Sequence, residues 1–205
     1  MDMTRALTLM TILAAATGCS DDDAIDSDEA ARRAYLGLDV SIGVSLNLGF
    51  DGFNAANSAN IPPQMTAGVA SGTLTISGQV DQGASTNKGM RLQVGMVDYS
   101  DGVLVVMDGD EEIEVDLTYA TSAVVEEQPA LDLQLRDIPN GTFTGTLAGT
   151  YQISGDISGD VTLALTMSGA IQDDGNGDVI RVPGSTTISG TATSGDGLYT
   201  VSITR

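Results

Sequence analysis

The residues of this chain that are best suited to chemistry are carboxylates in two short acidic segments. In the first, four oxygen-bearing side chains fall within six positions: Asp173, Asp174, Asn176 and Asp178. In the second, Asp108 and Asp110 precede two glutamates. Carboxylate and amide oxygens are typical calcium ligands, but the first segment lacks the glycine at the sixth and the glutamate at the twelfth position of an EF-hand loop. We therefore expect acidic hairpin turns and no cofactor, with Ca²⁺ as the alternative.

The composition excludes the commonest nucleophilic machinery. The chain has no histidine and one cysteine, so neither a Ser-His nor a Cys-His pair can be assembled. Zinc sites built on these ligands are excluded for the same reason. A pair of carboxylates can hydrolyse a glycosidic bond, yet most acids of this chain fall in turns or at polar positions of the expected strands. We predict that the protein is not an enzyme.

The single cysteine, Cys19, follows a segment with the features of an export signal. Residues 1–18 contain one basic residue, Arg5, then an apolar run over residues 6–16 and small residues up to Gly18. The apolar run is about half as long as the ~20 residues that a membrane-spanning helix needs. An unpaired cysteine in an exported protein also requires an explanation.

The run Leu13-Ala14-Ala15-Ala16-Thr17-Gly18-Cys19 resembles the lipobox of bacterial lipoproteins. In that family the signal peptide is removed and the cysteine is acylated. The resemblance implies a signal peptide over residues 1–18 and attachment to a membrane through acylated Cys19, where each buried CH₂ contributes about 0.8 kcal/mol. A cleaved signal peptide followed by a chance cysteine is the alternative. The implied location is the cell envelope, as an outer-membrane lipoprotein on the periplasmic face or at the cell surface.

An acidic segment follows the cysteine and begins Ser20-Asp21-Asp22-Asp23. It has few bulky apolar residues to bury, so we assign residues 19–33 to the anchor and a flexible tether. Serine and aspartates directly after the lipid-bearing cysteine also resemble the surface-export signal of lipoproteins in some Gram-negative lineages. That resemblance implies display at the cell surface.

The net charge of the chain, −20 at pH 7, restricts its partners. Removal of residues 1–18 takes away one acid and one base, Asp2 and Arg5, so the charge is unchanged. A chain this acidic is repelled by the phosphates of nucleic acids and by anionic lipid headgroups. We therefore exclude nucleic acid as a partner.

Apolar and polar residues alternate along most of the chain after residue 34. The alternation covers residues 35–50, 90–96, 113–119, 131–135, 157–171 and 199–203. A period of two places the apolar side chains on one face of a strand. Turn sequences such as Asn140-Gly141 separate several of these segments, as in hairpins. We predict a single all-β antiparallel domain over residues 34–205, with nine or ten strands and the first strand over residues 35–50.

Glycines on the apolar faces favour a strongly curved sheet. Gly145 and Gly149, for example, alternate with large apolar residues in the strand that starts near Thr142. Large and small inward residues in alternation suit a small barrel, and short hairpins suit up-and-down connections. We predict an up-and-down barrel or half-barrel. A β-sandwich, with longer linkers near residues 51–68 and 120–129 as crossovers, is the alternative.

Two functions fit this architecture. The first is a structural or interaction module of the cell envelope that contacts a protein or glycan, with strand faces rich in threonine such as Thr142, Thr144 and Thr146. The second is a carrier of an apolar small ligand in a barrel-like cavity, by fold analogy with lipocalins and lipoprotein-handling envelope proteins. Four methionines are candidates to line that cavity: Met90, Met96, Met107 and Met167. We favour the first function; a hollow interior would favour the second.

Overall fold

The structure is a computed structural model that describes Ile25, residues 27–108 and residues 110–205. The elements of the described chain are α1 (Asp28–Asn54), β1 (Gln64–Ala67), β2 (Ser71–Val80), β3 (Lys88–Ser100), β4 (Val103–Asp108), β5 (Glu111–Ala120), the 3₁₀ helix η1 (Val125–Glu127), β6 (Ala130–Arg136), β7 (Thr142–Gly155), β8 (Gly159–Asp173), β9 (Val179–Arg181), β10 (Thr187–Ser194) and β11 (Gly197–Thr204). The predicted signal peptide, Cys19 and the first residues of the predicted tether lie outside the described residues.

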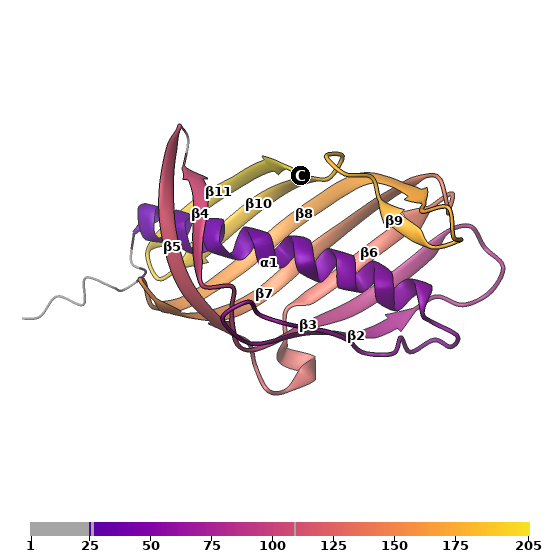
Figure 1. The fold of residues 1–205 in the computed structure, drawn as a ribbon, viewed down its shortest axis with the longest axis horizontal. Coiled ribbons are helices and arrows are strands. Elements are labelled where there is room, and N and C mark those ends of the chain that lie inside the picture. Colours follow the sequence, from indigo (N-terminus) through magenta and orange to yellow (C-terminus); the bar gives the residue numbers. More distant parts are fainter. Residues whose placement is uncertain (1–24, 26, 109) are drawn as a thin grey trace, which may run out of the picture.

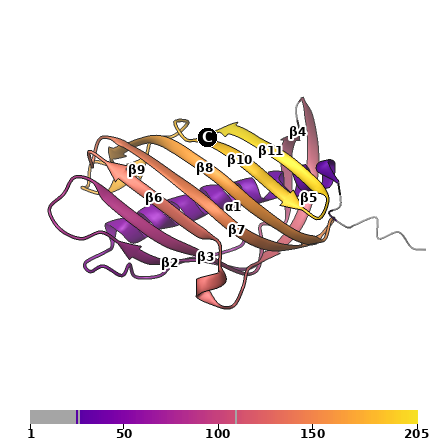
Figure 2. The same ribbon diagram turned by 180° about the vertical axis from the view of Figure 1, so that it is seen from behind.

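The strands form one antiparallel sheet. Along the sheet the order is β1-β2-β3-β6-β7-β8-β10-β11, while β5 joins β3 and β7 beyond the end of β6. Strand β4 pairs with β5, and β9 pairs with β8. Figures 1 and 2 show the sheet curving around one side of α1. The predicted all-β antiparallel domain is confirmed, and its sheet is an open half-barrel that does not close. The described chain has eleven strands, more than the nine or ten predicted.

The alternation of the sequence sets the two faces of this sheet. Along β7, Phe143, Leu147 and Tyr151 are buried, whereas Thr144 and Thr146 are exposed. Strand β8 has the same alternation, and the register of the two strands places apolar residues beside apolar residues. The concave face is therefore apolar and the convex face polar, as a period of two predicts.

The prediction of a strand over residues 35–50 is wrong, because this segment lies within helix α1. The buried side of the helix has a helical period and takes residues from both halves of the alternating pattern: Ala31, Ala34, Tyr35, Leu38, Ser41, Ile42, Ser45, Leu46, Gly49 and Phe50. With Gly37, Gly43 and Gly52, which are also buried, eight of the thirteen buried residues are Gly, Ala or Ser, so the helix backbone can approach the sheet. Ser27 caps the helix, since its side chain accepts a hydrogen bond of 3.2 Å from the backbone N–H of Ala30.

Helix α1 fills the concave face of the half-barrel. Its apolar side chains Leu38, Ile42, Leu46 and Phe50 are at most 2% exposed. The ring of Phe50 meets that of Phe143 edge-on, with 5.8 Å between the ring centroids. Burial of each of these side chains contributes roughly 1.5–3 kcal/mol to folding, so the helix is a principal part of the core.

The chain is fastened to the domain from Ile25 onward. Ile25 is buried, and its carbonyl accepts a hydrogen bond of 3.2 Å from the hydroxyl of Ser194. Asp28 accepts a hydrogen bond of 2.8 Å from the backbone N–H of Leu198. Residues 28–33 belong to α1, so this part of the predicted tether is helical. Within the described residues, no helix combines the length and apolar character needed to cross a bilayer.

Candidate functional site

The space that a carrier would use for its ligand is occupied by α1. Three of the four methionines proposed to line a cavity, Met90, Met96 and Met167, are buried in the common core with the helix. The fourth, Met107, is 54% exposed and lies on the solvent-facing side of strand β4. The structure therefore does not bring the four methionines together, and the buried ones pack against other side chains.

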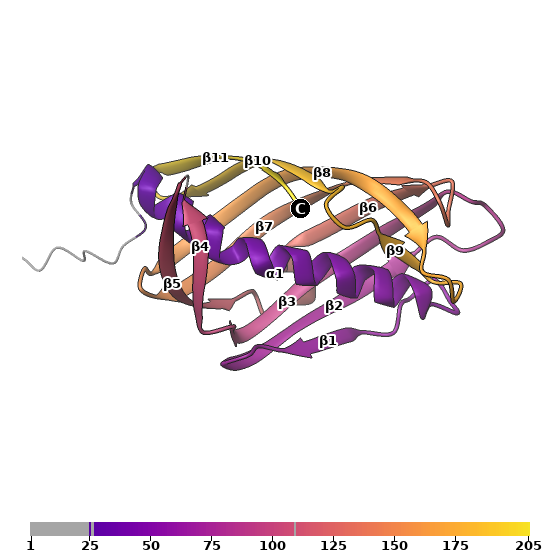
Figure 3. The ribbon, with the colours of Figure 1, turned by 45° about the horizontal axis from the view of Figure 1, so that its top comes forward.

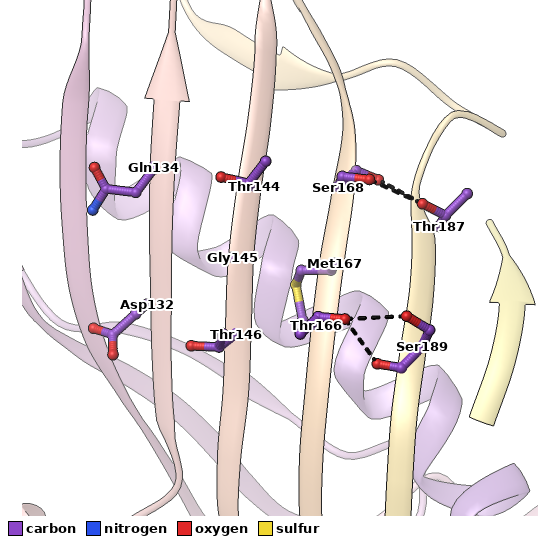
Figure 4. Close-up of a pocket in the computed structure, with 10 residues that line it drawn as sticks. All are labelled: Asp132, Gln134, Thr144, Gly145, Thr146, Thr166, Met167, Ser168, Thr187 and Ser189. Carbon is purple, nitrogen blue, oxygen red and sulfur yellow. Dashed lines mark hydrogen bonds between the residues drawn. The ribbon is translucent and has the colours of Figure 1, made fainter. Parts of the chain in front are cut away.

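The convex face carries a broad polar surface across β6, β7, β8 and β10, shown in Figure 4. It contains a depression of about 510 Å³ whose polar lining residues are Asp132, Gln134, Thr144, Thr146, Thr166, Ser168, Thr187 and Ser189. The hydroxyls of Thr166 and Ser189 lie 3.1 Å apart, and those of Ser168 and Thr187 lie 3.0 Å apart. Hydroxyls on β8 and β10 thus bond to one another across the strands, which favours a solvated surface over a preformed polar site.

The aromatic residues offer no platform for a glycan. All three phenylalanines and five tyrosines fall in the described chain, and none of them is exposed. The four most deeply buried tyrosines, Tyr35, Tyr99, Tyr119 and Tyr151, belong to the core. The two partly exposed rings, Phe53 and Tyr199, are half-buried, which disfavours recognition of a sugar by stacking on an aromatic face.

The first acidic segment forms the turn between β8 and β9. Asp174 accepts hydrogen bonds from the backbone N–H groups of Asn176 at 2.8 Å and Asp178 at 3.1 Å, and from the side-chain amide of Asn176 at 2.9 Å. These bonds, above all that of the Asn176 side chain, hold the pKa of Asp174 below its usual value. Asp173 accepts a bond of 2.6 Å from the backbone N–H of Gly175. The carboxylates thus close their own turn.

The second acidic segment lies at the tip of the hairpin that joins β4 and β5. Asp108 is the last residue of β4, and Asp110 is exposed in the turn before β5. Figures 1 and 3 show this hairpin and strand β9 near opposite ends of α1, so the two acidic segments do not meet. Among the described residues, no group of three or more His, Cys, Asp or Glu is placed to hold a metal ion.

Two arginines form polar contacts with α1 near Gly43. Arg181, on β9, donates a hydrogen bond of 2.7 Å to the side chain of Asn47 and one of 3.3 Å to the carbonyl of Gly43. Arg205 forms an ion pair with Asp39. Both arginines line a depression of about 320 Å³ beside Gly43. These contacts fasten the helix to β9 and to the last residue of the chain.

The β4–β5 hairpin carries a row of exposed apolar side chains. One of its faces carries Val103, Val105 and Met107, which are 58%, 62% and 54% exposed. The register pairs them with three exposed acids on β5: Asp116, Glu114 and Glu112. We call these six residues the hairpin face. It consists of an apolar row on β4 beside an acidic row on β5.

The opposite side of the hairpin packs on the domain. Val115 and Leu117 are buried, and their side chains lie 3.3 and 3.0 Å from the position that a Cβ at Gly37 would take. On β4 itself, Leu104 and Val106 are half-buried on this inner side, so both sides of β4 are apolar, one partly covered and the other open to solvent. The run Val103-Leu104-Val105-Val106 was a sequence signal for this surface, because a strand with one solvated face normally alternates with polar residues.

No protein-family model, no curated protein and no solved structure matches this chain. The candidate site therefore rests on the geometry of the chain itself.

Proposed function

We propose that this protein is a lipid-anchored interaction module of the cell envelope that binds a partner protein through the hairpin face. The observation that carries the proposal is the row of Val103, Val105 and Met107, each more than half exposed on a strand at the margin of the sheet. Contiguous apolar surface of this kind, bordered by charged residues, is typical of protein-binding sites.

The resemblance of residues 13–19 to a lipobox supports the anchor. From Cys19 to the buried Ile25 an extended chain spans at most about 20 Å. Figures 1 and 3 show the hairpin near the beginning of α1, which is also the end of the domain next to Ile25. In this proposal the hairpin face lies close to the membrane, where it meets a partner of the periplasmic face or the cell surface.

The packing of α1 favours a protein partner over an apolar ligand. A carrier would need the helix to leave the concave face and expose Leu38, Ile42, Leu46 and Phe50, all of which are now buried. A glycan partner is less well supported than a protein, because the convex face offers hydroxyls without an aromatic platform. We also retain the proposal that the protein is not an enzyme and that no nucleic acid binds to it.

Photo-crosslinking in the cells that produce the protein tests the binding surface. A photoreactive residue replaces Val105 in one variant and Val97 in the other. Val97 is a matched control, since it is also a valine on a strand and is 64% exposed, against 62% for Val105. We expect a discrete crosslinked protein from position 105 and none from position 97. Equal crosslinking from both positions, or none from position 105, would refute the proposal.

Acylation is tested separately. We expect a fatty-acid label to be incorporated into the native chain, and expect the Cys19→Ala variant to lose both the label and its recovery with the membrane fraction. A native chain without the label contradicts the anchor and leaves the cleaved signal peptide as the explanation of residues 1–18.

A further inference from the structure

Strand β4 has a free backbone edge. In the described chain it pairs only with β5, and its six residues are matched one to one with residues of that strand. The hydrogen-bonding groups on its other edge point away from β5. A strand edge without a partner is a template for a further strand, and exposed edges of apolar composition are normally protected by charges, prolines or a covering element. Strand β4 has no charged residue and no proline between Val103 and Met107.

The surface beside this edge is an apolar groove. It is about 380 Å³ in volume, and its apolar lining includes Val40 and Val44 of α1, Val69 after β1, and Leu104 of β4. The outer side of α1 forms the floor, because Val40 and Val44 are only half-buried there. An element that covered the groove would bury these valines against the hairpin.

The spacing of the elements fits one additional strand. Neighbouring strands lie about 4.8 Å apart, and a helix rises 1.5 Å per residue. Each additional strand that crosses the helix therefore covers about three more residues along the helix axis. Strand β5 contacts the helix at Gly37, and β4 follows it towards Val40. A strand added at the free edge of β4 would therefore lie over Val44, where the groove is open.

The charge of the hairpin defines the chemistry of the added strand. No lysine or arginine occurs between Asp101 and Ala120, whereas the hairpin face presents Glu112, Glu114 and Asp116 beside its apolar row. Lysine and arginine side chains on the outer side of the added strand could lay their apolar stems over Val103 and Val105 and direct their charges to these acids. A second copy of the chain is disfavoured as the occupant, because each copy carries a net charge of −20.

We propose that β4 binds an extended segment of a partner protein as an added β-strand, with apolar residues turned towards Val40 and Val44 and basic residues turned towards the acidic row of β5. The proposal rests on the proposed function, since it specifies how the hairpin face holds its partner. Main-chain hydrogen bonds would provide affinity, and the alternation of apolar and basic residues would provide specificity.

A short peptide tests the chemistry of the occupant. The probe is a capped seven-residue peptide in which lysine and valine alternate, added to the full acylated chain in detergent micelles. One control peptide has the same composition with its lysines and valines in separate blocks, and the other has glutamate in place of lysine. We expect only the alternating lysine peptide to slow hydrogen exchange in the β4 segment, and its affinity to fall as salt is raised.

Two matched variants of the protein locate the binding. Val105→Lys adds a like charge on the outer row of β4, and Val97→Lys adds the same charge at an equally exposed valine of β3. We expect the first to weaken binding of the lysine–valine peptide about tenfold and the second to leave it unchanged. Equal loss in both variants, equal binding of the block peptide, or binding without protection of β4 would overturn strand addition. If position 105 crosslinks to a partner in cells while the peptide fails, strand addition is wrong and the proposed function stands. If position 105 forms no crosslink, the proposed function itself fails.

Discussion

Removing the hydroxyl of Tyr119 is expected to stabilise the protein. This side chain is 2% exposed, and its hydroxyl is buried without a hydrogen-bond partner among the described residues. Burial also raises the pKa of the phenol, so the group stays protonated at any working pH. An unsatisfied buried hydroxyl costs about 1–3 kcal/mol. Tyr119→Phe should therefore raise the free energy of unfolding by about 1 kcal/mol or more.

The matched control is Tyr99, which pairs with Tyr119 in the register of β3 and β5 and is also 2% exposed. Its hydroxyl donates to the carboxylate of Asp101, with O–O distances of 2.9 and 3.0 Å. Tyr99→Phe removes this hydrogen bond, and a hydrogen bond to a charged group contributes about 1.5–3 kcal/mol. The same chemical change should thus have opposite signs at two paired positions.

A second substitution tests the contact between the hydroxyl and the helix. A Cβ at Gly37 would lie 2.4 Å from the oxygen of Tyr119. In the native background, Gly37→Ala gains about 1 kcal/mol of helix propensity but incurs about 1–3 kcal/mol of overpacking. In the Tyr119→Phe background most of the overpacking is gone, although the side chain of Leu117 remains 3.0 Å away. The two substitutions should therefore couple by about 1–2 kcal/mol.

Urea unfolding, followed by circular dichroism on the chain without residues 1–19, measures all of these variants. We expect the order of stability to be Tyr119→Phe, then native, then Tyr99→Phe. A loss of stability in Tyr119→Phe would mean that the hydroxyl has a partner. An equal cost of Gly37→Ala in both backgrounds would mean that the helix does not approach the sheet at this residue.

Three further predictions concern charged groups. Asp39→Asn should lower the free energy of unfolding by about 1 kcal/mol and reduce its dependence on salt, because the substitution breaks a half-buried ion pair with Arg205; urea unfolding at two salt concentrations measures both effects. The melting temperature should be the same in millimolar calcium and in chelator, because the carboxylate of Asp174 already accepts hydrogen bonds within its own turn; a rise in calcium would establish a metal site. The hydrogen bond from Arg91 is the main cause that holds the pKa of Asp81 below its usual 3.8. The stability from this contact is therefore present above pH 3.8 and is lost as the pH falls through the pKa of the folded state. An NMR titration should show a higher pKa for Asp81 in Arg91→Ala than in the native protein.

The strands of this fold could be predicted because each has one face in the core and one in solvent. The alternation of Phe143, Thr144 and Thr146 along β7 and the turn at Asn140-Gly141 are local signals, and the structure follows them. The curvature was also indicated by inward glycines. A Cβ at Gly145 would lie 2.4 Å from a side-chain carbon of Leu133 on the neighbouring strand, so this position has no room for a larger residue.

The helix could not be predicted from the alternation, because the apolar residues of this segment fit both the two-residue period of a strand and the period of a helix. With Leu38, Ile42 and Leu46 spaced by four, every second residue and every fourth residue give an apolar series at once. The deciding signals were the cap at Ser27 and the small residues at Ser41 and Ser45, which a close-packed helix buries and a half-exposed strand would place in solvent. Their meaning depends on a sheet that the rest of the chain has to form.

The placement of α1 also explains why the candidate site lies at the margin of the sheet and not in its centre. A half-barrel that retained a ligand would need an empty concave face, but here the helix supplies the apolar side chains that fill it. The same helix has a second, half-buried apolar side at Val40 and Val44, and only the first part of that side is covered by the β4–β5 hairpin. The sheet thus covers the inner side of the helix, whereas β4 leaves the outer side open at Val40 and Val44. A binding partner that adds a strand would continue a packing pattern that the chain itself begins.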